Sequence, residues 1–135
     1  MLTKKRLHIV MTISVLLVIG LSACSTTIRG TNTQASYKLQ RSLTAPVYWE
    51  VKVEGTARKV FDAAMMATKD LSLSVLHQKS DQLTGVIKGY FADGTKFGIK
   101  INLDSPGITK LQITAGNTGD KTLVLQIFKT IEKHM

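Results

Sequence analysis

Apolar and polar residues alternate between positions 47 and 54, where the chain reads VYWEVKVE. One side of this stretch carries only apolar side chains, from Val47, Trp49, Val51 and Val53. A period of two residues is typical of a strand with one buried face, so we predict a strand here. Gly55 then ends the pattern, and Thr56 is suited to cap the element that follows.

After Thr56 the apolar positions recur every three or four residues, which is the spacing of an amphipathic helix. The positions of this stripe are Ala57, Val60, Phe61, Ala64, Met65, Thr68 and Leu71. Adjacent methionines at 65 and 66 could suggest a metal or redox site, but a stripe at helical spacing is more simply one face of a hydrophobic core. We therefore predict a core-packed helix.

Four further strands are predicted after this helix. The sequence reads LSLSVLHQ over 71–78, LTGVIKGYF over 83–91, TKFGIKINL over 95–103 and ITKLQITAG over 108–116. In the first of them, Leu73, Val75 and His77 are expected on one side. A turn is expected over 104–107, because this stretch reads DSPG.

The short loop at 92–94, which reads ADG, decides how two of these strands pair. A two-residue turn at Asp93-Gly94 would put Ile87 and Ile99 on opposite faces. A three-residue loop with a left-handed Gly94 pairs Ile87 with Ile99, so the apolar faces agree. We therefore predict the three-residue loop.

The last predicted element is a helix over 121–133. Its buried side is expected to carry Val124, Ile127, Phe128 and Ile131. The resulting order is β-α-β-β-β-β-α. With both helices on one face of a mainly antiparallel sheet, the expected fold is a two-layer α+β sandwich.

The first 23 residues have a different pattern, with a basic start at 4–6 and a mostly apolar run over 9–19. This run is shorter than the roughly 20 residues that a permanent membrane-spanning helix needs. The arrangement is typical of a secretory signal peptide, which is removed from the mature protein. Residues 1–23 are therefore interpreted as a signal peptide.

The leader ends in Leu21, Ser22, Ala23 and Cys24. This sequence resembles the lipobox of bacterial lipoproteins, in which an aliphatic residue and two small residues precede a cysteine. The resemblance implies cleavage between Ala23 and Cys24. It also implies a diacylglyceryl group on the Cys24 thiol and an acyl chain such as palmitate on its freed amine. Two or three acyl chains make a stable membrane anchor.

The residue after the cysteine affects which membrane receives such a lipoprotein. In bacteria that resemble the enteric model, aspartate at this position retains the protein at the inner membrane. Ser25 instead favours the periplasmic face of the outer membrane. Residues 24–45 are polar and lack periodicity, so they are expected to form a lipidated flexible tether, although the alternation in SYKLQRSL leaves room for part of it to pack on the domain. The periplasmic α+β domain is expected over 46–135.

Composition adds an excess of positive charge but names no reaction. Removal of residues 1–23 takes three of the 18 basic residues and none of the 9 acidic ones, so the net charge falls from +9 to +6. This charge is scattered, which together with export disfavours nucleic-acid binding. Cys24 is the only cysteine, so neither an internal disulfide nor a paired-cysteine zinc site is possible.

Few residues are candidates for a chemical site. His77 is a lone strand histidine, more simply structural than a ligand, while His8 leaves with the leader and His134 is expected at a fraying end. Asp62 and Asp70 lie eight residues apart on one helix, about 80° apart around its axis, and do not form a facing pair. No catalytic, metal or cofactor pattern is present.

Two further features have both a functional and a structural interpretation. The GNTGD loop over 116–120 resembles an anion-binding loop in outline but lacks the ending of a phosphate loop. A glycine turn that places Asp120 at a helix start explains it more simply. Trp49, Tyr48 and Tyr90 could stack on a ligand, although strand aromatics are more often core or cross-strand neighbours.

Three longer stretches resemble the DUF3568 family, small bacterial lipoproteins with a domain of unknown function. They are the helix VFDAAMMATKDLSLSV, the hairpin GVIKGYFADGTKFGIKI and the end LQITAGNTGDKTLVLQIFKTI. The resemblance covers roughly 49–131 and implies an envelope location and an α+β fold without any activity. The chain departs from the family at Ser72, where a glycine is expected near the helix end.

Together these observations predict a non-enzymatic binding or assembly domain, held at the bilayer through Cys24. Its expected partner is another envelope protein, peptidoglycan or anionic lipid, and no cofactor is expected apart from the covalent lipid. The alternative is a small-ligand binder or hydrolase that uses the sheet face near Tyr90 and His77. A self-assembling structural subunit is a third possibility.

Overall fold

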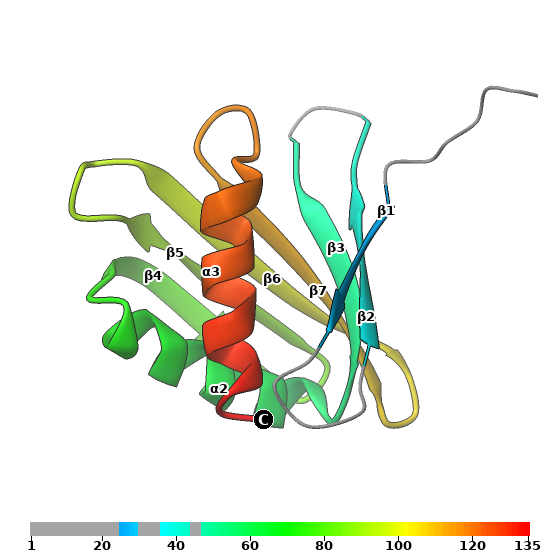
Figure 1. Cartoon of the computed structure of the whole chain (residues 1–135). Coiled ribbons are helices and arrows are strands. Elements are labelled where there is room, and N and C mark those ends of the chain that lie inside the picture. Colours follow the sequence, from blue (N-terminus) through cyan, green and yellow to red (C-terminus); the bar gives the residue numbers. More distant parts are fainter. Residues whose placement is uncertain (1–24, 30–35, 44–46) are drawn as a thin grey trace, which may run out of the picture.

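The computed structural model describes residues 25–29, 36–43 and 47–135 (Figure 1). The predicted signal peptide, including Leu21, Ser22 and Ala23, and the predicted lipidation site Cys24 lie outside the described residues. The same holds for 30–35 and 44–46.

The described residues form one seven-stranded sheet in which every neighbouring pair is antiparallel. Its spatial order is β1-β2-β3-β7-β6-β5-β4. The strands are β1 (Ser25–Arg29), β2 (Ser36–Arg41), β3 (Trp49–Glu54), β4 (Ser74–Ser80), β5 (Thr84–Tyr90), β6 (Lys96–Ser105) and β7 (Ile108–Ala115).

Two helices, α2 (Ala57–Asp70) and α3 (Lys121–Glu132), lie together on one face of this sheet (Figure 1). Helix α2 packs on β4, β5 and β6, while α3 packs on β7 and on α2. The buried apolar side chains of both layers form one core. The predicted two-layer α+β sandwich is therefore confirmed.

Strand β3 shows how the alternating pattern builds this core. Trp49, Val51 and Val53 are buried, as predicted, and the residues between them face away from the helices. Trp49 pairs with Ile113 and Val51 with Leu111, so apolar residues of β3 and β7 lie side by side. Such cross-strand pairs stabilise a sheet on its buried face.

The predicted hairpin register between β5 and β6 is confirmed. Ile87 pairs with Ile99, and the amide of Phe91 donates to the carbonyl of Thr95 across the three-residue loop. Gly94 has φ of 84°, the left-handed conformation that the loop requires. The turn after β6 is shorter than the predicted turn over 104–107, because β6 continues through a bulge to Ser105.

Strand β4 starts at Ser74 rather than at the predicted position 71, and it contains one extra residue. Val75 pairs with Gly89 and His77 with Lys88, so Leu76 is an extra residue that forms a bulge. A bulge of one residue moves every later side chain to the other face. The expectation that His77 shares a side with Leu73 and Val75 is therefore wrong, and His77 lies on the face opposite the helices.

The segment expected to be a tether also differs from the prediction. Ser25–Arg29 pairs with Ser36–Arg41, and β2 joins β3 through the pairs Gln40–Glu50 and Arg41–Trp49. Leu39 is fully buried, which agrees with the alternation seen in SYKLQRSL. Polar strands are hard to recognise because backbone pairing with an existing sheet edge, rather than a run of apolar side chains, holds them.

Helix α2 ends in a Schellman motif, in which two backbone amides return to helix carbonyls. The amide of Leu73 donates to Thr68 and that of Ser72 to Lys69. Ser72 has φ of 52°, a left-handed conformation that is costly for a residue with a side chain. The family resemblance led us to expect glycine at this position, and the backbone gives the physical reason.

Replacing Ser72 by glycine should therefore stabilise the protein. Relief of the left-handed strain outweighs the extra freedom of glycine in the unfolded chain, so we expect the free energy of unfolding to rise by about 0.5–1 kcal/mol. Urea unfolding measures this change. Ser74→Gly, in the extended strand that follows, is the control and should not raise the free energy of unfolding. If the free energy of unfolding of Ser72→Gly is equal to or lower than that of the parent protein, the explanation is contradicted.

Candidate functional site

The face of the sheet opposite the helices carries an open hollow of about 540 Å³. Three central strands and the residue before β3 supply its walls. The lining residues are Val86 and Lys88 of β5, Gly98, Ile99 and Lys100 of β6, Gln112 and Thr114 of β7, and Tyr48. The volume lies in the range of small-molecule sites, but the hollow is open to solvent on one side.

The hollow has its floor at Gly98, where a strand residue lacks a side chain. Gly98 pairs with Lys88 on one side and with Thr114 on the other, so both neighbours direct side chains to the same face. A Cβ atom at position 98 would lie 2.8 Å from Thr114 Oγ1. Because Gly98 projects no side chain from the sheet, the side chains of its neighbours Lys88 and Thr114 surround an open space above it.

Lys88 and Lys100 bring two positive charges to the rim. Both are exposed, and neither forms an ion pair within the part of the chain that the structure describes. Lys100 lies across from Val86 on one side and from Gln112 on the other. The hollow thus combines two ammonium groups with the hydroxyl groups of Tyr48 and Thr114.

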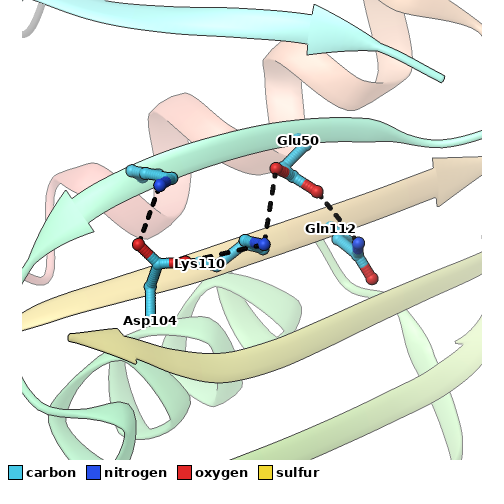
Figure 2. Close-up of polar contacts among 5 residues, drawn as sticks. Glu50, Asp104, Lys110 and Gln112 are labelled. Carbon is cyan, nitrogen blue, oxygen red and sulfur yellow. Dashed lines mark hydrogen bonds and ion pairs between the residues drawn. The ribbon is translucent and has the colours of Figure 1, made fainter.

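The neighbouring part of the same face is neutralised internally by a polar network (Figure 2). Lys52 Nζ lies 2.7 Å from Asp104, and Lys110 Nζ lies 3.6 Å from Asp104 and 3.8 Å from Glu50. The Gln112 amide donates to Glu50 at 3.0 Å. Two carboxylates therefore serve two lysines, and the lysines at the hollow receive no share of them.

The pKa values in this network show the same pairing. The hydrogen bond from Lys52 lowers the pKa of Asp104, and the same bond raises the pKa of Lys52. Asp104 thus stays ionised and bound to its lysines at neutral pH. Lys88 and Lys100 are two of the exposed lysines on this face that lie outside the network, and their positive charge favours binding of an anionic group.

His77 and Tyr90, the residues of the alternative prediction, lie on this face but do not line the hollow. His77 is exposed and pairs with Lys88 across the edge of the sheet, and Tyr90 pairs with Ser74. No nucleophile and base lie together among the lining residues. The structure thus brings His77 close to one wall of the hollow without giving it a catalytic partner there.

The two aromatic residues near the start of β3 have different roles. Trp49 is a core residue, and its indole Nε1 donates to the carbonyl of Gly119 at 2.9 Å. Lys121 Nζ lies 5.8 Å from the centre of its ring. Tyr48 instead lines the hollow, so of the two only Tyr48 lies at the candidate site.

The GNTGD loop is a structural turn, as its simpler interpretation predicted. The Asp120 carboxylate accepts hydrogen bonds from the amides of Thr122 and Leu123 at the start of α3. These are the amides that a bound anion would use. Gly119 is left-handed, and a Cβ atom there would lie 2.7 Å from Val47.

The remaining ionisable residues considered in the sequence form separate pairs and do not gather into one site. Asp62 pairs with Arg58 at 3.3 Å, and Asp70 pairs with His134 at 2.6 Å. The expectation of a fraying end at His134 is wrong, because this contact ties the C-terminus to α2. Among residues 25–29, 36–43 and 47–135, no three side chains of His, Cys, Asp or Glu gather as a metal site.

Four polar residues of the hollow were not predicted from the sequence as site residues, namely Lys88, Lys100, Gln112 and Thr114. Their signal was indirect, because the predicted pairing of Ile87 with Ile99 also places Lys88 opposite Gly98 on the outer face. A glycine between two long side chains on an exposed face is the pattern that could have indicated a hollow. The charge balance could not be derived, since it depends on which lysines meet Glu50 and Asp104.

Two comparisons with known proteins bear on identity. None of the curated proteins compared with this chain matches it. The family described as "Protein of unknown function (DUF3568)" matches residues 6–134, a range that includes the predicted lipidation site and the whole sandwich. Among the described residues, neither helix is long and apolar enough to span a bilayer. Because the matched range of 6–134 covers nearly the whole sequence, the chain belongs to the DUF3568 family.

Proposed function

We propose that this chain is a lipid-anchored envelope protein of a bacterium whose domain binds an anionic partner and catalyses no reaction. The observation that carries the binding role is the hollow over Gly98, where Lys88 and Lys100 have no ion pair within the described part of the chain. Absence of a nucleophile–base pair from its lining supports a binding role rather than catalysis.

The anchoring role rests on the leader. A basic start, an apolar run and the sequence Leu21-Ser22-Ala23-Cys24 support processing between Ala23 and Cys24, with acylation of Cys24. Ser25 favours the periplasmic face of the outer membrane. The lipid on Cys24 is the bilayer contact of this proposal, and the domain acts in the periplasm.

The chemistry of the hollow limits what the partner presents. Two ammonium groups favour a carboxylate or phosphate group, and the flanking hydroxyl and amide groups can bind its polar neighbours. An open site suits a group that projects from a larger partner, such as peptidoglycan or an acidic envelope protein. A free anionic small molecule is the second candidate, because the volume of about 540 Å³ would hold one.

Photo-crosslinking in intact cells tests the binding face. A photoreactive amino acid at Val86, which lines the hollow, should form an adduct that mass spectrometry can identify. The double substitution Lys88→Gln and Lys100→Gln, made in the protein that carries the photoreactive amino acid at position 86, should lower the adduct yield about tenfold. Two charge-assisted contacts to the partner are lost in this variant.

The matched control replaces Lys59 and Lys129, exposed on α2 and α3, by glutamine and should leave the yield unchanged. A photoreactive amino acid at Met66, which lies on α2 away from the hollow, tests whether adducts form only at the hollow. Equal adducts from positions 86 and 66, or no loss in the Lys88/Lys100 variant, would contradict the proposal. A small-molecule adduct at Val86 would favour the second candidate.

A further inference from the structure

The lipid anchor of the proposed function would lie directly at the folded sheet. Strand β1 begins at Ser25, one residue after Cys24, whereas the expected tether of 24–45 could have extended to about 70 Å. Consecutive Cα atoms are about 3.8 Å apart, so an acylated Cys24 would hold this end of the sheet at the bilayer. The domain then has little freedom to stand away from the membrane.

The register identifies which end of the molecule is held. Ser25 pairs with Gln40, and Gln40 pairs with Glu50 near the start of β3. The chain continues from β2 past this level to Leu43. The start of β1, the end of β2 and the loop between β7 and α3 lie at the same end of the sheet, at the top of Figure 1.

Leu43 makes this end apolar as well as accessible. Its side chain is 94% exposed, more than the 67% of Leu76, the next most exposed large apolar side chain in the described ranges. The amide of Ser42 donates to the carbonyl of Tyr48 at 2.8 Å, which fixes the chain beside Leu43. A fully exposed leucine beside a lipid anchor suits insertion into the membrane interface.

Two cations lie at the same end of the sheet as Leu43. Arg41 Nη2 donates to the carbonyl of Thr118 at 3.3 Å, and Lys121 lies over the ring of Trp49, the residue paired with Arg41. Both side chains are exposed. The nearby Asp120 carboxylate is directed to the first amides of α3, where its charge is partly compensated.

From these observations we infer that the surface formed by Arg41, Leu43 and Lys121 docks on a lipid bilayer that contains anionic headgroups. Leu43 enters the interface, and the two cations contact lipid phosphates or other anionic headgroups. The inference rests on the proposed anchor at Cys24. It adds that the domain lies on the membrane in one orientation.

The test uses the full protein purified from membranes and reconstituted into vesicles. Leu43→Cys is labelled with a dye that brightens in an apolar environment, and Leu76→Cys, on the opposite edge of the sheet, is the matched control. In vesicles with anionic lipid, the dye at 43 should be bright and quenched by lipid-borne quenchers, while the dye at 76 should stay in water.

Charge dependence completes the test. Arg41→Gln and Lys121→Gln should each lower the ratio of docked to undocked protein about fivefold, and vesicles of neutral lipid should reduce docking for the parent protein. Mass spectrometry of the same samples reports the lipid on Cys24. Lipid on Cys24 with equal signals at 43 and 76 would overturn this inference alone. An unlipidated Cys24, which would take a second dye, would overturn the proposed anchor and the inference with it.

Discussion

Cys24→Ser should abolish incorporation of labelled fatty acid into the protein. Serine lacks the thiol that carries the diacylglyceryl group, and the chain has no other cysteine. Cleavage before residue 24 should fail as well, so the variant should keep its 23-residue leader. Metabolic labelling with palmitate and intact-protein mass spectrometry measure both effects, and the expected loss of label is complete.

An uncleaved leader could itself hold the variant at the membrane, so fractionation needs a second variant. With residues 1–23 exchanged for an ordinary secretory leader and Cys24→Ser, the domain should appear in the soluble periplasmic fraction. Ser25→Ala is the matched control and should keep both label and membrane association. Label on Cys24→Ser, or membrane-bound protein after the leader exchange, would contradict lipidation at Cys24.

Phe128→Ala should have the largest effect on folding. Phe128 lies on α3 with a fully buried side chain, between the helix layer and the sheet. Removal of a buried phenylalanine ring typically lowers the free energy of unfolding by about 3–5 kcal/mol. Since small domains have about 5–15 kcal/mol in total, the urea midpoint should fall strongly.

Met66→Ala provides the control on the other helix. This side chain is 51% exposed, so its truncation should change the free energy of unfolding by less than about 0.5 kcal/mol. Phe128→Leu should recover part of the loss, because it refills part of the cavity. Similar urea midpoints for Phe128→Ala and Met66→Ala would contradict the assignment of Phe128 to the core.

The central part of the fold was predictable because burial there follows a simple period. Trp49, Val51 and Val53 alternate, Val60 and Phe61 belong to a helical stripe, and all five are buried as expected. The pairing of Ile87 with Ile99 was also derivable, since a one-residue slip would turn apolar side chains to solvent.

The edges of the sheet were less predictable for the opposite reason. At β4 the bulge at Leu76 moves His77 to the outer face, and an exposed edge strand tolerates such an extra residue at little cost. At the other edge, β1 and β2 have little apolar pattern, and β2 gains its place from backbone pairing with β3. No local pattern reports a partner that is distant in the chain.

The candidate site depended on tertiary structure for a similar reason. The sequence gives Lys52, Lys88, Lys100 and Lys110 the same character, namely a lysine on the outer side of a strand. Only the strand order places Lys52 and Lys110 beside Asp104, while Lys88 and Lys100 remain beside Gly98. The difference between the network and the candidate binding site is therefore that, within the described part of the chain, the lysines of the network are paired with carboxylates and those of the hollow are not.

By itself, the sequence determined the helices, the central strands and their buried faces, because hydrophobic periodicity is a local property of the chain. It also supplies the whole basis for the proposed anchor at Cys24, which a protease and an acyltransferase would recognise as a short linear segment. Only the tertiary structure decided that β1 starts at Ser25 within the sheet, that His77 faces outward, and that Lys88 and Lys100 lack ion pairs among the described residues. These three features depend on the exact register and order of the paired strands, which the local pattern of apolar and polar residues does not report.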